Sequence, residues 1–194
     1  MTRGTEETSW TTRIRRAARL AGEVAYTRWR GRRHAHATGT ASWRQAVEES
    51  STRLLRSVAV DVEIRGARPL LAGPVLLVAN HVSWLDAQAL GAVAGTRFVA
   101  KSEVRDWPVI GTMAARFGTL FIRRGHRRDA HRMKNAIAKL LVTGERIVVF
   151  PEGTTTDGTR VAPFYSALLQ AAVDAAVPVQ PVAIRYREAD GAPS

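Results

Sequence analysis

From about residue 59 onward, short apolar runs alternate with longer segments whose apolar positions recur at helical spacing. The apolar runs that have the length of strands are Val58–Ile64, Val75–Ala79, Phe98–Ala100, Leu120–Ile122, Ile147–Phe150 and Val179–Tyr186. The segments that favour helices are Asp86–Val93, Val109–Phe117, Arg128–Val142 and Phe164–Ala176. Because alternating strands and helices are typical of parallel sheets, we predict an α/β fold with a mixed, largely parallel sheet flanked by helices.

The first part of the chain, residues 1–58, is more polar than the predicted α/β domain at 59–194. We expect it to be irregular, basic and partly helical. Ile14, Ala18, Ala21 and Ala25 recur at roughly helical spacing with arginines between them. This pattern indicates either a basic amphipathic helix in the headgroup region of a membrane or a solvated helix without that role.

Composition narrows the classes of partner. The 194 residues suit one domain with its own hydrophobic core, and the absence of cysteine excludes disulfides, thiolate zinc sites and cysteine nucleophiles. The formal charge of +12 favours a polyanionic partner: nucleic acid, an anionic membrane leaflet or phosphorylated small molecules. No apolar run reaches the ~20 residues of a spanning helix, and no secretory signal is recognisable, so we expect a location on the cytoplasmic side.

The segment Asn80–Asp86 is the first candidate site, because it directly follows the apolar run Val75–Ala79. Active sites of α/β proteins lie at the carboxyl ends of parallel strands. Asp86 can hold one ring nitrogen of His81 and leave the other free to take a proton from a hydroxyl group. Taken alone, this spacing is weak evidence, since it also arises by chance.

A second candidate site, Phe150–Gly158, also follows an apolar run. Gly153 permits a close backbone approach to a ligand, and Thr154 with its neighbouring threonines offers hydroxyls and amides that suit an anion. An ordinary polar turn uses the same residues. Glu152 is the more informative residue, because a carboxylate beside an anion site can bind acceptor hydroxyls or fix a basic side chain.

Basic residues follow the remaining apolar runs. Arg123 and Arg124 come after Leu120–Ile122, and Lys101 comes after Phe98–Ala100. Arginine binds phosphates and carboxylates through two parallel hydrogen bonds, and lysine adds a point charge. We expect these residues at the rim of the site and the other basic residues nearby on the solvated surface. His34 and His36 have no carboxylate beside them, so we predict a surface loop there and no metal site.

Together and in this order, these segments resemble the glycerophospholipid acyltransferase family. The similar blocks are N-H-x-x-x-x-D at Asn80–Asp86, G-x-x-F-I-x-R at Gly118–Arg124, F-P-E-G-T at Phe150–Thr154 and V-P-[VI]-x-P-[VI] at Val177–Val182. The resemblance covers residues 59–187 and none of residues 1–58. It implies a glycerol-3-phosphate acyltransferase-like fold.

The resemblance also implies an activity, in which a fatty acyl group moves from an acyl-CoA or acyl carrier protein thioester to the hydroxyl of a lysolipid in membrane lipid biosynthesis. His81 would act as general base and Asp86 as its orienter, without a covalent acyl-enzyme, a cofactor or a metal. With Thr154 and Lys101 from the residue patterns, the expected substrate-binding residues are Arg123, Arg124, Glu152, Gly153, Thr154 and Lys101.

The sequence departs from the family pattern at Thr155, where the family commonly has arginine. The Phe-Pro-Glu-Gly-Thr-Thr variant resembles the branch that acylates lyso-ornithine lipid, so both that lipid and 1-acylglycerol 3-phosphate remain candidate acceptors. The chain ends soon after Val179–Tyr186. We therefore expect it to lack the usual C-terminal elements of the family. We also expect it to lack the family's apolar N-terminal anchor.

Two alternative functions remain open. The chain could be a non-catalytic basic protein that binds membranes or nucleic acid, because aromatic residues such as Trp10, Tyr26, Trp29 and Trp43 lie among the basic ones. It could also transfer acyl groups to a sugar or an amine. We favour the lysolipid enzyme, with no nucleic-acid partner and with salt-sensitive, peripheral binding to anionic lipids through residues 13–33.

Overall fold

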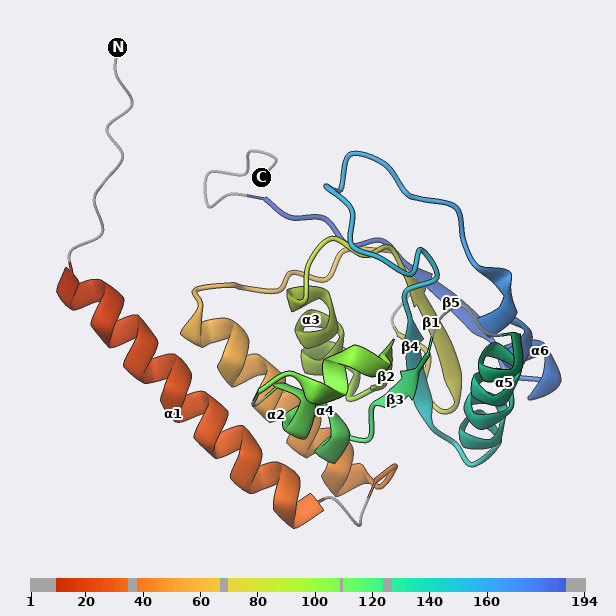
Figure 1. Ribbon diagram of the computed structural model, residues 1–194, viewed down its shortest axis with the longest axis horizontal. Helices are drawn as coiled ribbons and strands as arrows, with labels where there is room; N and C mark the ends of the chain where they lie inside the picture. The colour runs from red at the N-terminus through yellow and green to blue at the C-terminus, as the bar shows by residue number, and fades with distance from the viewer. Residues whose placement is uncertain (1–9, 35–37, 67–69, 109, 124–126, 188–194) are drawn as a thin grey trace.

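The structure is a computed structural model that describes residues 10–34, 38–66, 70–108, 110–123 and 127–187 (Figure 1). Its helices are α1 (Trp10–His34), α2 (Ala41–Ser57), α3 (Leu85–Ala94), α4 (Ile110–Arg116), α5 (Arg127–Val142) and α6 (Gln170–Asp174), with short 3-10 turns η1 (Ser102–Asp106) and η2 (Ser166–Leu168). Its strands are β1 (Val75–Ala79), β2 (Arg97–Lys101), β3 (Leu120–Ile122), β4 (Arg146–Val149) and β5 (Val179–Val182).

The strands form one sheet in the order β3-β2-β4-β1-β5, and every neighbouring pair is parallel. Helices α2 and α3 lie on one side of this sheet, and α5 and α6 lie on the other (Figure 1). A parallel sheet covered on both faces explains why β1 reads as an unbroken apolar run whose five residues are all buried. The predicted α/β fold with a parallel sheet flanked by helices is confirmed.

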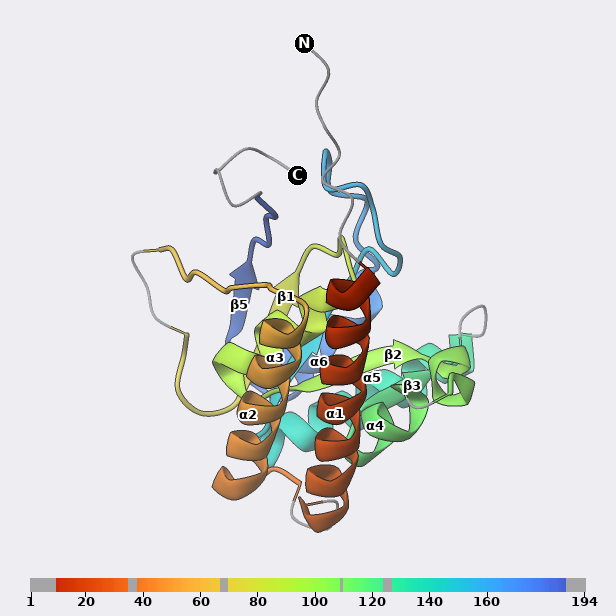
Figure 2. The same cartoon turned by 90° about the vertical axis from the view of Figure 1, so that its left-hand side faces the viewer.

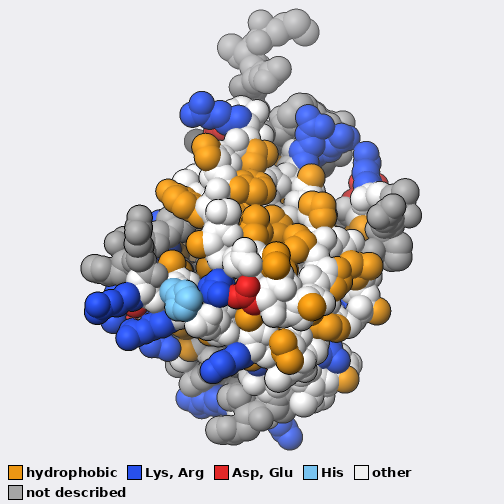
Figure 3. Space-filling model, turned by 90° about the vertical axis from the view of Figure 1, so that its right-hand side faces the viewer, with side chains coloured by type: hydrophobic (Ala, Val, Ile, Leu, Met, Phe, Trp, Pro, Cys, Tyr) orange, Lys and Arg blue, Asp and Glu red, His pale blue; other side chains and the backbone are white. Residues whose placement is uncertain are grey.

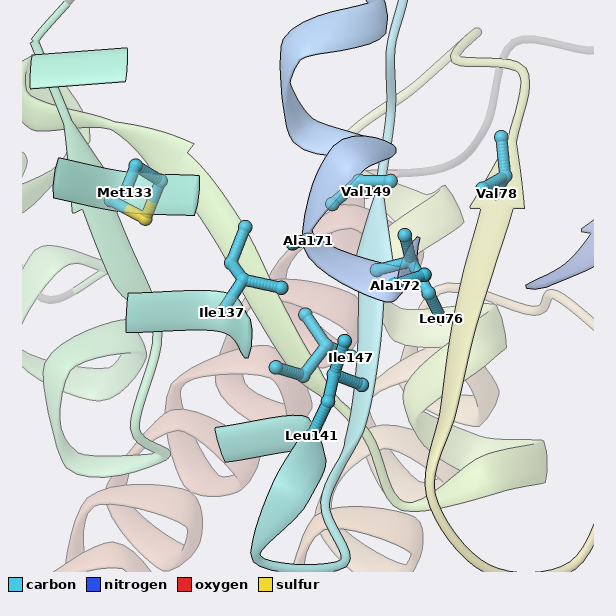
Figure 4. Packing of buried hydrophobic residues seen from close by; sticks show 9 residues of the cluster. All are labelled: Leu76, Val78, Met133, Ile137, Leu141, Ile147, Val149, Ala171 and Ala172. Carbon is cyan, nitrogen blue, oxygen red and sulfur yellow. The ribbon is translucent and has the colours of Figure 1, made fainter. Parts of the chain in front are cut away.

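The face of the sheet toward α5 and α6 holds the larger hydrophobic cluster. Side chains from α5 and α6 meet alternate residues of β1 and β4 there (Figure 4). The labelled members are Leu76, Val78, Met133, Ile137, Leu141, Ile147, Val149, Ala171 and Ala172. The other residues of β1 pack toward α3, so the strand is fixed from both faces and its carboxyl end rigidly supports the loop that begins at Asn80.

The N-terminal helices lie side by side as an antiparallel pair on the α3 side of the molecule (Figure 2). The hydroxyl of Thr40 caps α2 by accepting a hydrogen bond from the amide of Trp43. Trp43 is completely buried, and Leu54 and Leu55 are buried near the other end of α2. Residues 1–58 are thus helical, as expected in part, but the two long helices make this segment more regular than expected, and α2 packs deeply. The division at residue 58 stays a prediction.

A buried ion pair lies where β2 and β4 begin, at the edge of the sheet opposite to their carboxyl ends. Arg97 donates to Glu145 at 2.8 Å and to the carbonyl of Gly118 at 3.1 Å. Its guanidinium also lies over the ring of Trp43, at 5.2 Å from the ring centroid. These contacts connect α2 with the starts of three strands, which makes this edge a structural one.

Some predicted elements differ from the observed ones. Val58–Ile64 alternates like a strand, but in the structure Val58 and Ala59 form the turn that ends α2, and the rest is a largely exposed segment without strand pairing. β1, the strand that follows, already has β4 and β5 on its two sides. The predicted helix Phe164–Ala176 is shorter, with an exposed loop before η2 and α6. The last predicted strand ends at Val182, after which the chain continues without regular pairing as far as Tyr186.

The face over α5, α6 and β5 carries a broad band of hydrophobic side chains, with basic side chains mostly at its margins (Figure 3). Tyr165, Val173 and Val179 are exposed hydrophobic residues of this part of the chain. Among the helices that the structure describes, none combines the length and the apolar character needed to cross a bilayer.

Candidate active site

All five parallel strands bring their carboxyl ends to one edge of the sheet, where loops can place side chains from distant parts of the sequence together. β1 leads into Asn80 and His81, and its neighbour β4 leads into Phe150 and Glu152. The two candidate segments therefore meet at this edge. The backbone amide of Thr156 donates to the carbonyl of His81 at 2.8 Å, which holds the segments together.

His81 and Asp86 form the predicted pair. The Nδ1 atom of His81 lies 2.8 Å from Oδ2 of Asp86. Because a carboxylate oxygen only accepts, Nδ1 carries the hydrogen and Nε2 keeps its lone pair. No hydrogen bond to Nε2 is seen from the described residues. The ring therefore has one nitrogen fixed and one available to a substrate.

Asp86 is fully buried in the first turn of α3 and is held by several donors. Its Oδ2 also accepts from the amides of Val82 at 2.6 Å and Ser83 at 2.9 Å, and its Oδ1 accepts from the hydroxyl of Tyr186 at 2.6 Å. Burial raises the pKa of Asp86, but the hydrogen bonds from His81, Tyr186, Ser83 and Val82 outweigh it and lower the pKa below its usual value. Asp86 is thus ionised and fixed in orientation.

Tyr186 is a residue of this site that the motifs did not indicate. It comes from the extended segment after β5, one hundred positions away from Asp86 along the chain. Burial raises the pKa of Tyr186 strongly, and the hydrogen bond to the Asp86 carboxylate raises it further. The alternation of apolar residues along Val179–Tyr186 was the only sequence signal that pointed its side chain inward.

The imidazole of His81 is oriented by packing as well as by hydrogen bonding. It stacks on the ring of Phe150, with centroids 4.1 Å apart and planes 15° apart. The His81 side chain keeps 21% of its surface exposed. Aromatic stacking on one face and the Asp86 hydrogen bond at one edge leave the Nε2 edge as the accessible part of the ring.

Glu152 is buried and is not one of the exposed residues around the site. Its Oε1 accepts from the amide of His81 at 2.7 Å, and its Oε2 accepts from the amide of Ala162 at 2.7 Å. Both oxygens are therefore occupied by the protein backbone. The expected role of Glu152 as a substrate ligand stays a prediction, and the geometry favours a different one: it fixes His81 and the 153–162 loop relative to β4.

The turn after Glu152 has the shape that the sequence suggested. Gly153 adopts a positive φ of 72°, a conformation that favours glycine, and its amide donates to the carbonyl of Phe150 at 3.0 Å. Thr154 and Thr155 are exposed beyond it. Thr154 is thus accessible to a ligand, while the Gly153 amide is already used within the turn.

The expected cations lie on the β3–β2 side of the same edge. Lys101 pairs in register with Ile122, so Lys101 and Arg123 end neighbouring strands. Both side chains are exposed. They are available to an anionic group, and β2 separates β3 from β4 and its Glu152 loop. The predicted ligand Arg124 lies outside the described residues.

No cluster of three or more histidine, aspartate or glutamate side chains that could hold a metal ion occurs among the described residues. The absence of a cofactor stays a prediction.

A histidine with one free nitrogen, fixed by a buried aspartate at the carboxyl edge of a parallel sheet, is the arrangement of a general base for a hydroxyl substrate. The sequence profile of the family named Acyltransferase matches residues 61–185, and the chain belongs to this acyltransferase family. The predicted family membership is confirmed.

Two relatives illustrate the similarity. The chain is 45% identical over 141 residues to a lyso-ornithine lipid O-acyltransferase of Pseudomonas aeruginosa, covering 73% of this chain and 53% of that protein. It is 38% identical over 183 residues to a 1-acyl-sn-glycerol-3-phosphate acyltransferase of Neisseria meningitidis, covering 94% of this chain and 71% of that one. The chain thus spans about half of the first relative and about seven tenths of the second.

The fold also matches a solved structure. The crystal structure of the 1-acyl-sn-glycerophosphate acyltransferase PlsC from Thermotoga maritima superposes with a TM-score of 0.59 at 23% identity, covering 84% of this chain and 73% of that one. At this identity the match concerns the fold alone.

Proposed function

We propose that the chain catalyses transfer of a fatty acyl group from a thioester to the hydroxyl of a lysolipid. The observation that carries this proposal is the His81–Asp86 pair, with Nδ1 held at 2.8 Å and Nε2 free. The two relatives described above are acyltransferases of lyso-ornithine lipid and of 1-acyl-sn-glycerol 3-phosphate. Both names give a lysolipid as the acceptor of those proteins.

The proposed reaction uses the geometry of the pair. Nε2 of His81 takes the proton of the acceptor hydroxyl as its oxygen attacks the thioester carbonyl carbon. The tetrahedral intermediate then collapses, its carbon–sulfur bond breaks, and the proton passes from His81 to the leaving sulfur. The products are a new ester and a free thiol. Asp86 remains ionised and stabilises the imidazolium that forms between these steps.

The acceptor's anionic head group is proposed to bind at the β3–β2 side of the edge, where Arg123 and Lys101 are exposed. Arginine and lysine there would hold a phosphate or a carboxylate while the hydroxyl reaches His81. Thr155 stands where many family members have arginine, which weakens the case for a phosphate. The proposal therefore includes both a phosphate and an ornithine head group. The acyl donor is an acyl-CoA or an acyl carrier protein, and no cofactor takes part.

We further propose that α1 binds the cytoplasmic surface of an anionic membrane. Trp10, Ile14 and Trp29 are 75%, 45% and 50% exposed, and Ala18, Ala21 and Ala25 between them are also exposed. These residues succeed one another at intervals of three or four, so they form one apolar stripe along an arginine-rich helix. Such a helix can bury its stripe at the headgroup boundary while its charges attract anionic lipids.

Product analysis tests the proposed reaction. The purified chain would be given lysophosphatidate or lyso-ornithine lipid with either an acyl-CoA or an acyl carrier protein thioester, and the diacylated lipid would be measured by mass spectrometry. We expect product with at least one pairing, and the preferred acceptor identifies the head group. Transfer only to a sugar or an amine offered in parallel, or no product from any pairing by folded protein, would contradict the proposal.

A further inference from the structure

The second oxygen of Asp86 has a partner that the four sequence blocks do not contain. The hydroxyl of Tyr186 donates to Oδ1 of Asp86 at 2.6 Å. The family profile matches residues 61–185 and stops one residue before Tyr186. Asp86 is therefore contacted from two parts of the fold: the loop after β1, which reaches Oδ2, and the segment after β5, which reaches Oδ1.

The placement of Tyr186 is itself fixed by the site. The side chain of Asn80, next to His81, donates from Nδ2 to the carbonyl of Ile184 at 3.0 Å and accepts at Oδ1 from the amide of Ile184 at 2.7 Å. Val182 and Ile184 pack toward the cluster beside α3. Because extended residues alternate in direction, Tyr186 points to the same side, where Asp86 begins α3.

We propose that Tyr186 is a positioning residue for the His81–Asp86 pair, and that Asn80 sets the register that delivers its hydroxyl. This inference rests on the proposed function for its effect on rate. Rotation of the carboxylate about its Cβ–Cγ bond would move Oδ2 away from its three donors. The hydrogen bond from Tyr186 to Oδ1 adds a fourth contact that this rotation would break. It therefore restricts the carboxylate further, so that Oδ2 stays directed at Nδ1 of His81 and Nε2 stays directed at the substrate.

Few groups among the described residues face Asp86. They are the ring of His81, the hydroxyl of Tyr186 and the amides of Val82 and Ser83, and the Ser83 hydroxyl interacts in turn with that of Tyr186. Glu152 reaches the amide of His81 and not Asp86. Tyr186→Phe therefore removes one hydrogen bond of the Asp86 carboxylate and leaves the contacts with His81, Val82 and Ser83 in place.

The first test needs no substrate. The carboxyl carbon of Asp86 would be titrated by carbon NMR in the wild type, in Tyr186→Phe and in the control Tyr165→Phe, whose ring is exposed. Because the Tyr186 hydrogen bond lowers the pKa of Asp86, its loss should raise that pKa, and the control substitution should leave it unchanged. An unchanged titration in Tyr186→Phe would overturn the inference, whether or not the chain is an acyltransferase.

The second test separates positioning from general structural support. We expect Tyr186→Phe to lower kcat about tenfold and to change KM for the acceptor less than about twofold. In an Asp86→Asn background, the same substitution should change kcat less than about twofold, because its target is already altered. Equal losses in both backgrounds, or an unchanged kcat in the first, would overturn the inference. Absence of activity in the wild type would contradict the proposed function, and the NMR titration would then decide the role of Tyr186.

Discussion

Asp86 is the buried carboxylate that orients the candidate base His81. A ring nitrogen, two backbone amides and a tyrosine hydroxyl donate to it, and the helix N-terminus beside it also favours negative charge. Such a group cannot leave its position without breaking several bonds at once. The ring of His81 is thereby held in one orientation, with Nε2 accessible to a substrate.

The lowered pKa of Asp86 makes stability depend on pH. Because this pKa is lower in the folded chain than in the unfolded one, ionised Asp86 stabilises the fold above the usual aspartate pKa of about 4, and the contribution disappears as pH falls through the folded value. Above about pH 5, Asp86→Asn should be less stable by about 2 kcal/mol, and acidification should close the gap. Urea unfolding from pH 7 downward measures this.

The control for that series is Asp61→Asn, because Asp61 is exposed in the segment between α2 and β1. It should follow the wild type at every pH. A stability gap for Asp86→Asn that stays constant on acidification would contradict the role given to the ionised carboxylate.

We expect Glu152 to stabilise the fold by accepting hydrogen bonds from the amides of His81 and Ala162, and not to bind substrate. Glu152→Gln turns one of its acceptor oxygens into an NH2 group that faces a backbone N–H, so we expect a loss of about 1–3 kcal/mol in the free energy of unfolding. The control Glu63→Gln, at an exposed carboxylate, should leave the free energy of unfolding close to the wild-type value. Thermal unfolding compares the two. A Glu152→Gln protein with wild-type stability and a raised KM for the acceptor would instead support direct ligation.

At the scale of elements, the carboxyl ends of the strands carry the site, whereas the amino ends of β2 and β4 carry a structural ion pair. The Arg97–Glu145 pair at the starts of β2 and β4 is buried and joins α2 to the sheet through Trp43 and Gly118. Removing one partner of a buried pair leaves an uncompensated charge. Arg97→Met should therefore cost about 3–5 kcal/mol, and Arg97→Met/Glu145→Leu should cost less than the sum of the single changes.

A double-mutant cycle by urea unfolding measures that coupling. The reaction rate per folded molecule should stay close to that of the wild type, since this edge does not contact the site. Additive losses, with no coupling between Arg97 and Glu145, would show that the pair does not work as a unit.

The apolar stripe of α1 gives a prediction about membrane binding. Trp10→Ala/Ile14→Ala/Trp29→Ala should weaken binding to phosphatidylglycerol vesicles at least about tenfold, because these side chains lose the apolar area that they would bury. Binding by the wild type should fall as salt is raised above about 0.1 M, where charges are screened within ~10 Å. Vesicle cosedimentation measures both effects.

Val173→Ala, an exposed substitution on α6, is the matched control and should bind like the wild type. Equal loss in the control and the α1 variant, or binding that ignores salt, would contradict the role of α1.

At the scale of the whole molecule, the sequence predicted most of the architecture that positions the site. Buried β1 and the period of α5 were evident because each faces a core with a regular spacing of apolar residues. The alternation in Val58–Ile64 was misleading, since strand pairing depends on which neighbours are already occupied. The deep burial of Trp43 was not evident either, because it comes from contacts with other elements, such as Arg97 of β2, and not from a pattern within α2.

In the site, too, local spacing predicted some contacts, whereas contacts between distant segments could not be predicted. His81 and Asp86 could be paired from their spacing, because both lie close together after one strand. Tyr186 and the backbone contacts of Glu152 could not, because they join segments that meet only when the sheet is formed. Contacts of that kind leave no local spacing in the sequence.

The most direct test of the role of His81 is acceptor-dependent release of thiol from an acyl thioester by wild type, His81→Ala and His131→Ala. His131 is an exposed histidine of α5 and serves as the control. We predict that wild type and His131→Ala release thiol when a lysolipid is added, and that His81→Ala loses at least about a hundredfold in rate, as expected for a general base. Undiminished release by folded His81→Ala would contradict that role.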